Sequence, residues 1–303
     1  MLSALSSAIR DGDLRKKILI TLGLVILYRI GAQIPSPGVD YPLLRGMLET
    51  AETGESAQMY SLINLFSGGA LLQLSVFAIG IMPYITASII VQLLTVVIPH
   101  FEQLKKEGQS GQAKMTQYTR YLTIALALLQ SAGIVALADR GQLLGNGQSV
   151  LIDNDVMTLI TIVIVMTAGA ALVMWFGEII TDRGVGNGMS LLIFASIASQ
   201  MPGEGINVYQ NSSTMKFVAV MVAVVLIVVG VVFVEQGQRR IPVQYAKRMV
   251  GRRTYGGTTT YIPLKINMAG VIPVIFSTSI LALPPLIAQF GQPTDEWVLW
   301  INR

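Results

Sequence analysis

The sequence predicts an all-α fold, a polytopic bundle of helices that crosses a membrane several times. Hydrophobic residues make up 52% of the 303 residues, charged residues only 13%, and the mean hydropathy is +0.61. A soluble domain of this size cannot bury so much apolar surface, so the solvent around most of the chain must be lipid. The apolar residues also gather into long runs, and a membrane-spanning helix needs about 20 of them.

Seven segments are apolar enough to be predicted as crossings. They are Ile18–Ile34, Val76–Ile98, Tyr121–Ala138, Val156–Gly177, Gly188–Met201, Lys216–Val234 and Ile266–Phe290. The fifth is short, but the charges of the connections support it. Lys and Arg precede the first segment and follow the second, fourth and sixth, whereas the other connections carry mostly Asp and Glu. Because positively charged loops stay in the cytoplasm, the N-terminus is expected inside.

The apolar run Ile63–Leu94 is too long for one crossing and is interrupted by Ser, Gly, Gln and Pro. Its first part, Asn64–Ser75, has helical character but about half the length needed to span. Irregular backbone within hydrocarbon is tolerated only where protein buries it or where it lines an aqueous cavity, and half-helices at membrane depth are typical of transport routes. Two interpretations stay open, a re-entrant half-helix and a helix lying on the outer membrane surface.

Polar side chains also mark the second predicted crossing, at Thr86, Ser88, Gln92 and Thr95. The last three recur at helical spacing on one face. Polar stripes within lipid most often form hydrogen bonds to neighbouring helices, and less often line an aqueous path. The first interpretation is favoured.

The segment Glu235–Lys265 is the most charged part of the chain and interleaves basic residues with three tyrosines. Such a composition suits phosphate groups and unpaired bases, or an acidic protein partner. The alternative is a topology signal that contacts anionic lipid. Gly256, Gly257 and Pro263 predict a hairpin, which favours a docking site for a macromolecule.

The sequence predicts no catalytic centre, metal site or cofactor. Cysteine is absent and there is one histidine, His100, so thiolate chemistry and histidine-rich metal sites are excluded. Ser110 lies in a GQSG stretch like that of intramembrane serine proteases, but in a Lys-rich connection without a positioned base. The glycine run Gly184–Gly188 joins two membrane segments instead of following a strand, and no phosphate-binding Gly-x4-Gly-Lys-Ser/Thr run occurs.

Eight stretches resemble the bacterial SecY family, the channel subunits of the Sec protein translocase. They are RIGAQIPSPGVD (Arg29–Asp40), NLFSGGAL (Asn64–Leu71), GIMPYITASIIVQLLTVV (Gly80–Val97), KKEGQSG (Lys105–Gly111), QYTRY (Gln117–Tyr121), RGVGNGMS (Arg183–Ser190), VEQGQRRIPVQYAKR (Val234–Arg248) and PLKINMAGVIPVIF (Pro263–Phe276). The resemblance implies an inverted-repeat channel fold, with residues 1–201 as the first half and 202–303 as a partial second half. It implies passage of unfolded secretory proteins and sideways release of membrane helices into lipid.

The resemblance also implies roles for individual residues. The plug, a re-entrant half-helix in the outer funnel, would contain Asn64, Phe66, Ser67, Gly68, Gly69, Leu71 and Leu74. The pore ring would consist of Ile81, Ile85, Ile193 and Ile275, whose branched apolar side chains hinder wetting. The lateral gate would involve Thr86, Gln92, Asn267 and Leu283. Docking would use Arg239, Arg240, Lys247, Arg248, Arg252 and Arg253.

The partners implied by the resemblance are the SecE and SecG subunits, the SecA motor ATPase, the ribosome with its RNA and proteins, signal peptides, nascent chains and membrane lipids. The location implied is the bacterial plasma membrane. Members of the family have ten membrane helices, so a chain that stops after the seventh at Arg303 is expected to be a fragment.

A secondary transporter is the alternative, because broken helices and inverted halves also describe those folds. A transporter should carry a charge near the membrane midplane. The only candidates, Arg29 and Glu178, lie near the ends of their predicted helices.

Overall fold

The computed structural model describes residues 11–44, 46, 69–71, 73–141, 149–153, 155–211, 213–243, 248–250, 253–255 and 260–267. Their helices are α2 (Gly12–Gln33), α5 (Met82–Val97), α6 (Pro99–Lys106), α7 (Gln109–Asp139), α8 (Val156–Arg183), α9 (Gly188–Asn211) and α10 (Thr214–Gln236). Their strands are β1 (Gln238–Val243), β2 (Arg248–Val250), β3 (Arg253–Tyr255) and β4 (Thr260–Lys265). The described residues fall into two compact units, one that ends at Glu204 and one that begins at Gly205.

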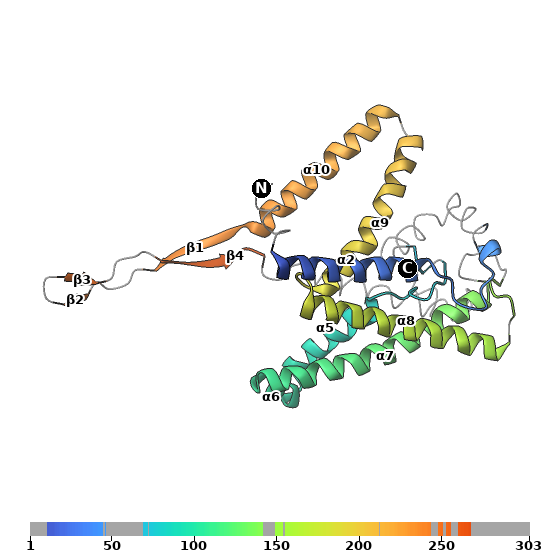
Figure 1. The fold of residues 1–303 in the computed structure, drawn as a ribbon, viewed down its shortest axis with the longest axis horizontal. Helices are drawn as coiled ribbons and strands as arrows, with labels where there is room; N and C mark the ends of the chain where they lie inside the picture. The colour runs from blue at the N-terminus through green and yellow to red at the C-terminus, as the bar shows by residue number, and fades with distance from the viewer. Residues whose placement is uncertain are drawn as a thin grey trace, which may run out of the picture. The chain divides into compact units, whose positions relative to one another are not determined.

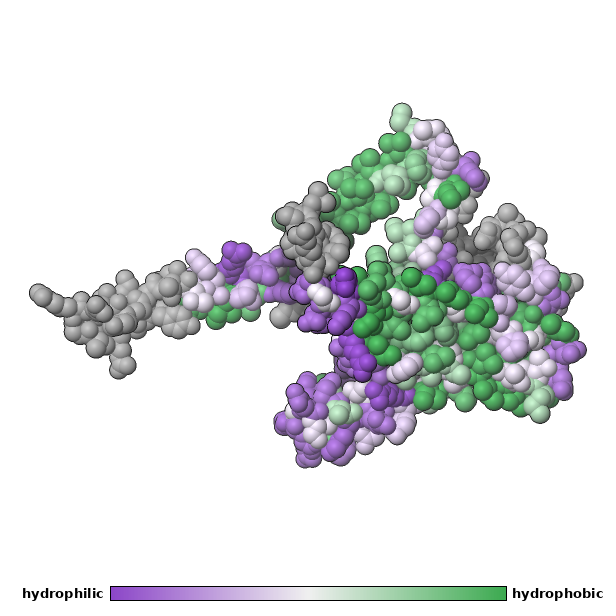
Figure 2. Space-filling model, in the orientation of Figure 1, coloured by the Kyte–Doolittle hydropathy of each residue, from purple (hydrophilic) through white to green (hydrophobic). Residues whose placement is uncertain are grey.

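Packing in the first unit joins consecutive helices and also pairs that are separated by other helices. α5 packs on α7, α7 on α8, and α2 on α8 (Figure 1). The main core cluster lies among α7, α8 and the turns before α5, with Leu74, Ile162 and Met166 fully buried. Figure 2 shows hydrophobic residues over α2 and α8 and hydrophilic residues over α6 and the start of α7.

Local sequence explains where several helices begin and end. The Asp11 side chain accepts a hydrogen bond from the backbone N–H of Asp13 and so caps α2. Ile98 precedes Pro99, and the residue before a proline is disfavoured in helical conformation. Its backbone is extended, with φ −106° and ψ 118°, and α6 leaves α5 at an angle of 100°. The end of the predicted second crossing is therefore a sharp corner.

The helices agree with the predicted crossings. Six of the seven predicted segments contain a described helix, and the seventh lies outside the described residues beyond Asn267. Among the described helices, α7, α8 and α10 are each long and apolar enough to cross a membrane alone, and the bent pair α5–α6 could form a fourth crossing. The helices α2, α5 and α9 are each too short or not apolar enough to meet the same criterion alone.

Two expectations are wrong in the segment before α5. The helix of the second predicted crossing begins at Met82 and not at Val76, and the described residues between 69 and 75 form turns and not a half-helix. The reason is local backbone geometry. Gly69, Leu74 and Gly80 have φ of 87°, 46° and 60°, which interrupts a right-handed helix. Residues 64–68, the start of the expected half-helix, lie outside the described residues.

The second unit contains α10 and the strands. β1 pairs antiparallel with β4, from Gln238 opposite Lys265 to Val243 opposite Thr260, and β2 pairs with β3. The hairpin predicted from glycine and proline is thus confirmed, and it is the one departure of the described residues from an all-α fold. The base of the hairpin is closed on α10, because the N–H of Ile266 donates to the carbonyl of Gly237 at 3.1 Å.

The close contact at Gly169 of α8 leads to the first prediction. A Cβ at Gly169 would lie 1.9 Å from the carbonyl oxygen of Val76, whereas a Cβ at Gly23 of α2 would meet no atom within 4 Å. We expect Gly169→Ala to lower the free energy of unfolding by about 1–3 kcal/mol, through overpacking. The control Gly23→Ala should raise it by about 0.5–1 kcal/mol, because alanine favours a helix. Denaturant titration in detergent micelles measures both, and equal effects of the two substitutions would contradict the contact.

Candidate functional site: an apolar cluster beside the turn before α5

Three of the isoleucines expected in the pore ring lie in one apolar cluster of the first unit. Ile81 is buried, and Ile85 and Ile193 are half-buried against the same cluster. The buried members of the cluster are Tyr28, Phe77, Ile81, Val173, Ile180 and Leu192. None of these residues carries a charge. The structure therefore brings together the start of α5 and α9, which are more than 100 residues apart. Ile275 lies outside the described residues.

Glycines allow α8 and α9 to pack closely beside this cluster. A Cβ at Gly188 would lie 2.0 Å from the carbonyl oxygen of Gly177. A Cβ at Gly177 would lie 2.3 Å from Sδ of Met189 and 3.6 Å from Cδ1 of Ile81. Because neither glycine has a side chain, the backbones of α8 and α9 touch, and Ile81 lies beside α8 at Gly177.

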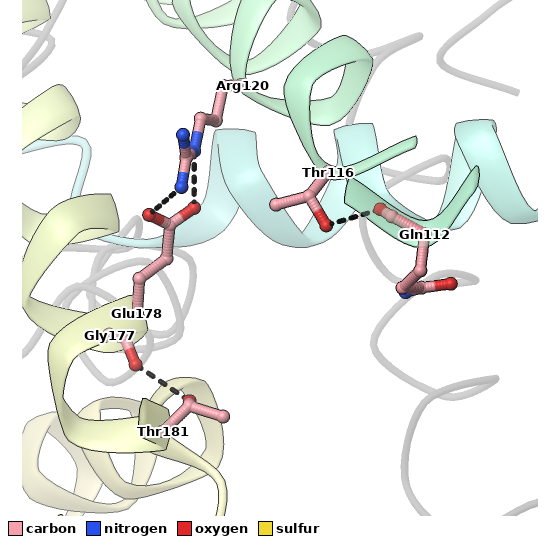
Figure 3. Close-up of polar contacts among 6 residues, drawn as sticks. All are labelled: Gln112, Thr116, Arg120, Gly177, Glu178 and Thr181. Carbon is pink, nitrogen blue, oxygen red and sulfur yellow. Dashed lines mark hydrogen bonds and ion pairs between the residues drawn. The ribbon is translucent and has the colours of Figure 1, made fainter. Parts of the chain in front are cut away.

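The turn between α8 and α9 is held by threonine hydroxyls. The Thr181 hydroxyl donates to the carbonyl of Gly177 at 2.8 Å (Figure 3) and accepts from the N–H of Gly188 at 2.9 Å. Thr21 of α2 accepts from the N–H of Val185 at 3.2 Å. Asn187 caps α9, since its Oδ1 accepts from the N–H of Met189 at 3.0 Å. The glycine run is therefore a tight helix–helix connection, and the expectation that it is no nucleotide loop agrees with this geometry.

An ion pair joins α7 to α8 near the same turn. Arg120 makes two hydrogen bonds to Glu178, Nε to Oε1 at 2.9 Å and a terminal nitrogen to Oε2 at 2.8 Å (Figure 3). The Glu178 side chain is only 16% exposed, whereas that of Arg120 is 42% exposed. Two parallel bonds fix the relative position of the two helices as well as neutralising the carboxylate. Glu178 is thus occupied by a structural partner.

The residues expected in the plug are described only from Gly69 onward. Leu74 is fully buried in the main core cluster and Leu71 packs against it, whereas Gly69 supplies a left-handed turn residue. Two backbone hydrogen bonds join this segment to the residues that follow α2. The N–H of Ser36 donates to the carbonyl of Leu74 at 3.0 Å, and the N–H of Val76 donates to the carbonyl of Ile34 at 2.9 Å. Asn64, Phe66, Ser67 and Gly68 lie outside the described residues.

The expected gate residues form mostly local contacts. The Thr86 hydroxyl donates to the carbonyl of Met82 at 3.1 Å within its own helix, and Gln92 is exposed. In the second unit, the Asn267 side chain donates to Glu235 at 3.3 Å. Leu283 lies outside the described residues. The favoured interpretation, hydrogen bonds from the stripe Ser88, Gln92 and Thr95 to neighbouring helices, is wrong for Thr95, whose hydroxyl donates to the carbonyl of Gln92 at 2.6 Å within the same helix.

The hairpin that would carry the docking residues has two different sides. Partners across an antiparallel pair share a face, so Ile241 lies with Ile262, and Arg240 with Pro263 on the other face. Figure 2 shows hydrophobic residues along one side of this hairpin and hydrophilic residues along the other. Arg239 and Arg240 are exposed, Arg248 and Arg253 lie on β2 and β3, and Lys247 and Arg252 lie outside the described residues.

Sequence reasoning missed two features of the site. The ion pair between Arg120 and Glu178 was not predicted, because 58 residues separate the two and the sequence of neither helix indicates which residue of another helix it will contact. Tyr28 was not singled out, although a tyrosine hydroxyl within an apolar crossing is a usable signal, because such a group requires a buried hydrogen-bond partner.

The ion pair leads to the second prediction. Glu178→Gln leaves the arginine with a neutral partner, so we expect the free energy of unfolding to fall by about 1–3 kcal/mol. Arg120→Gln should have a similar effect, and the double substitution should be less destabilising than the sum of the two. Thermal and denaturant unfolding in micelles measure this cycle.

Glu102→Gln is the matched control, because it removes the same charge from a pair of α6 in which Lys106 and Glu102 are 73% and 55% exposed. The hydrogen bond from Lys106 lowers the pKa of the Glu102 carboxyl, but water screens such a pair, and stability should not change. Full additivity at Arg120 and Glu178 would show that the two residues do not interact.

Comparison with known proteins identifies the family. The family model described as SecY matches residues 75–302. "Protein translocase subunit SecY" of Corynebacterium glutamicum is 69% identical over 302 residues, which cover 98% of this chain and 68% of that protein. The protein of the same name from Mycobacterium bovis is 65% identical over 290 residues, covering 95% of this chain and 66% of that protein. The chain thus spans about two thirds of the length of these relatives.

Solved structures share the fold at low sequence identity. "The structure of a protein conducting channel" aligns with a TM-score of 0.60 at 18% identity, over 95% of this chain and 59% of that chain. A structure described as "Sec61 in the Canine ribosome-channel complex from the endoplasmic reticulum" aligns with a TM-score of 0.55 at 17% identity, over 95% of this chain and 60% of that chain. Together with the sequence matches, these findings establish that the chain belongs to the SecY family.

Proposed function

We propose that this chain forms part of the pore of a protein-conducting channel, through which unfolded secretory proteins cross the bacterial plasma membrane. The observation that carries the proposal is the gathering of Ile81, Ile85 and Ile193 in one uncharged cluster. Branched apolar side chains around a narrow passage resist wetting, so ions are blocked when no polypeptide is present. The same side chains form no specific hydrogen bond, so they accept any unfolded sequence. The expected fourth member is Ile275.

The segment before α5 supports a plug in the proposed channel. Its described part is a chain of turns fastened at one end to α2, and residues from Asn64 to Leu74 would move as the pore opens. Thr86 and Gln92 would border a lateral gate with Asn267 and Leu283, through which membrane helices leave sideways. A weak seam is the physical requirement of such a gate, and the exposed Gln92 side chain supports it. The boundary between the two halves would fall near residues 201 and 202.

The hairpin after α10 would be the docking site for the partner that drives transport. Arg239 and Arg240 are exposed on a strand that begins directly after a helix able to cross the membrane. The basic residues suit the phosphates of ribosomal RNA and acidic surfaces of the SecA motor. SecE and SecG would complete the channel. In this arrangement the hairpin and the N-terminus lie in the cytoplasm, in agreement with the positive charge of both.

A coupled secondary transporter fits the described residues less well. Such a protein needs a titratable or ion-binding group available to its cargo. The carboxylate of Glu178 is engaged by Arg120 through two hydrogen bonds, and Arg29 also has an interaction partner. The proposed ring offers only apolar side chains, which suits a passive path for polypeptide.

Crosslinking tests the proposed pore, because the chain contains no native cysteine. Cysteine replaces Ile85 or Ile193 in the chromosomal gene, and a second cysteine is placed in a secretory protein stalled during export. We expect a disulfide between the two proteins at both positions. Ile164→Cys is the control, since Ile164 is an apolar residue of α8 that is 60% exposed and lies outside the ring cluster. A crosslink at Ile164 alone, with export intact, would refute the pore.

Charge reversal tests the docking site. We expect Arg239→Glu with Arg240→Glu to weaken binding of ribosomes to membrane vesicles about tenfold or more, and to reduce its dependence on salt, because contacts to phosphate are lost. Arg140→Glu is the control, as Arg140 is an exposed arginine at the end of α7. Ribosome affinity that is unaffected by the double reversal, or equally reduced by the control, would exclude these arginines from docking.

A further inference from the structure

Tyr28 of α2 is an unusual residue for the interior of the first unit. It is 1% exposed and is among the largest fully buried side chains of the described residues. Its hydroxyl lies 2.7 Å from Oγ of Ser196 in α9, which is itself 2% exposed and donates to the carbonyl of Leu192 at 3.0 Å. A hydroxyl buried without a partner is costly, so the pair stabilises one relative position of α2 and α9.

The ring of Tyr28 contacts a second element that approaches the pore. It stacks on Phe77, with centroids 6.1 Å apart and planes 12° apart, and Phe77 meets Phe176 of α8 edge-on. Gly31 leaves room for this arrangement, since a Cβ there would lie 2.1 Å from the Phe77 ring. The Tyr28 hydroxyl also lies 3.6 Å from where a Cβ of Gly80 would be. Tyr28 therefore touches the turn before α5 and the wall of α9 at once.

The two elements that Tyr28 contacts, the turn before α5 and α9, also carry residues of the proposed ring. Gly80 directly precedes Ile81, Phe77 lies four residues before it, and Ile193 lies three residues before Ser196, one helical turn away. We propose that Tyr28 is a positioning residue that sets the separation of Ile81 and Ile193, through its stacking on Phe77 and its hydrogen bond to Ser196. This inference rests on the proposed function, because a fixed separation matters only if these isoleucines close a pore.

Geometry, more than stability, is what this hydrogen bond contributes. A hydrogen bond between membrane helices contributes little to stability on average, so the loss of the Tyr28 hydroxyl should change unfolding little. Its direction, however, is sharply defined. A ring that excludes hydrated ions fails if its side chains move apart by less than the width of a water molecule. The resting ion conductance should therefore rise when the bond is lost, even where the stability of the fold does not change.

The test uses Tyr28→Phe and Ser196→Ala in the complete translocase, assembled in planar lipid bilayers without a translocating chain. Each substitution removes one partner of the bond and retains the rest of the packing. We expect each variant to raise the resting ion conductance at least threefold and the double variant to leak no more than the stronger single variant. The thermal midpoint of Tyr28→Phe, in which Ser196 keeps its bond to Leu192, should stay near that of the unchanged protein.

Ser131→Ala is the matched control. Ser131 is fully buried, and its hydroxyl pairs with that of Thr167 at 3.0 Å between α7 and α8, outside the cluster of the ring. Its removal should leave conductance unchanged. The inference is overturned if Tyr28→Phe and Ser196→Ala do not leak, if their leaks add, or if Ser131→Ala leaks equally. Crosslinking at Ile85 and Ile193 distinguishes failure of this inference from failure of the proposed pore. If the crosslinks form but Tyr28→Phe does not raise the ion conductance, the positioning role of Tyr28 is rejected and the proposed pore stands.

Discussion

The close approach of α8 to its neighbours at glycines is the constraint on which the first unit depends. Lipid chains are as apolar as leucine, so helices in a membrane gain little by hiding apolar surface from each other and associate through close packing instead. At Gly169 the backbone of α8 meets the turn before α5, and at Gly177 it meets the start of α9. Any side chain at these positions would collide with backbone or with Met189. These two contacts set the positions of Ile81 and Ile193. Ile81 follows the turn that packs on Gly169, and Ile193 belongs to the helix that packs on Gly177.

Polar groups complete this arrangement by finding partners away from the apolar ring. Thr181 and Thr21 bind the backbone of the short turn between α8 and α9, and Arg120 neutralises Glu178 across two helices. Tyr28 and Ser196 satisfy each other. In a medium without water, each of these groups would otherwise destabilise the fold. The result is an apolar cluster around Ile81 whose buried members carry no charge, bordered by helices whose polar groups are paired with one another.

The second unit is held by a different kind of contact, the backbone ladder between β1 and β4, whose residues are mostly exposed. An isolated two-stranded hairpin is marginally stable, and the contact of Ile266 with Gly237 ties its base to α10. Its exposed faces differ in character, with Ile241 and Ile262 on one and Arg240 on the other. Such a ribbon offers a partner both charge and apolar surface. It also connects the end of α10 with Asn267, whose side chain donates to Glu235.

The sequence by itself determined where the long helices lie, the hairpin and the family. Apolar length sets which segments lie in lipid, glycine and proline set the hairpin, and long motifs carry the resemblance, so these features are local and readable in order along the chain. Only the tertiary structure decided that the described residues between 69 and 75 do not form a helix, since Leu74 takes a left-handed backbone and Ser75 pairs with Pro35 of another segment. It also decided that Glu178 binds Arg120 and that Tyr28 binds Ser196. Such pairings depend on which helix faces come together, and a face is selected by the packing of whole helices around small residues, which no single stretch of sequence specifies.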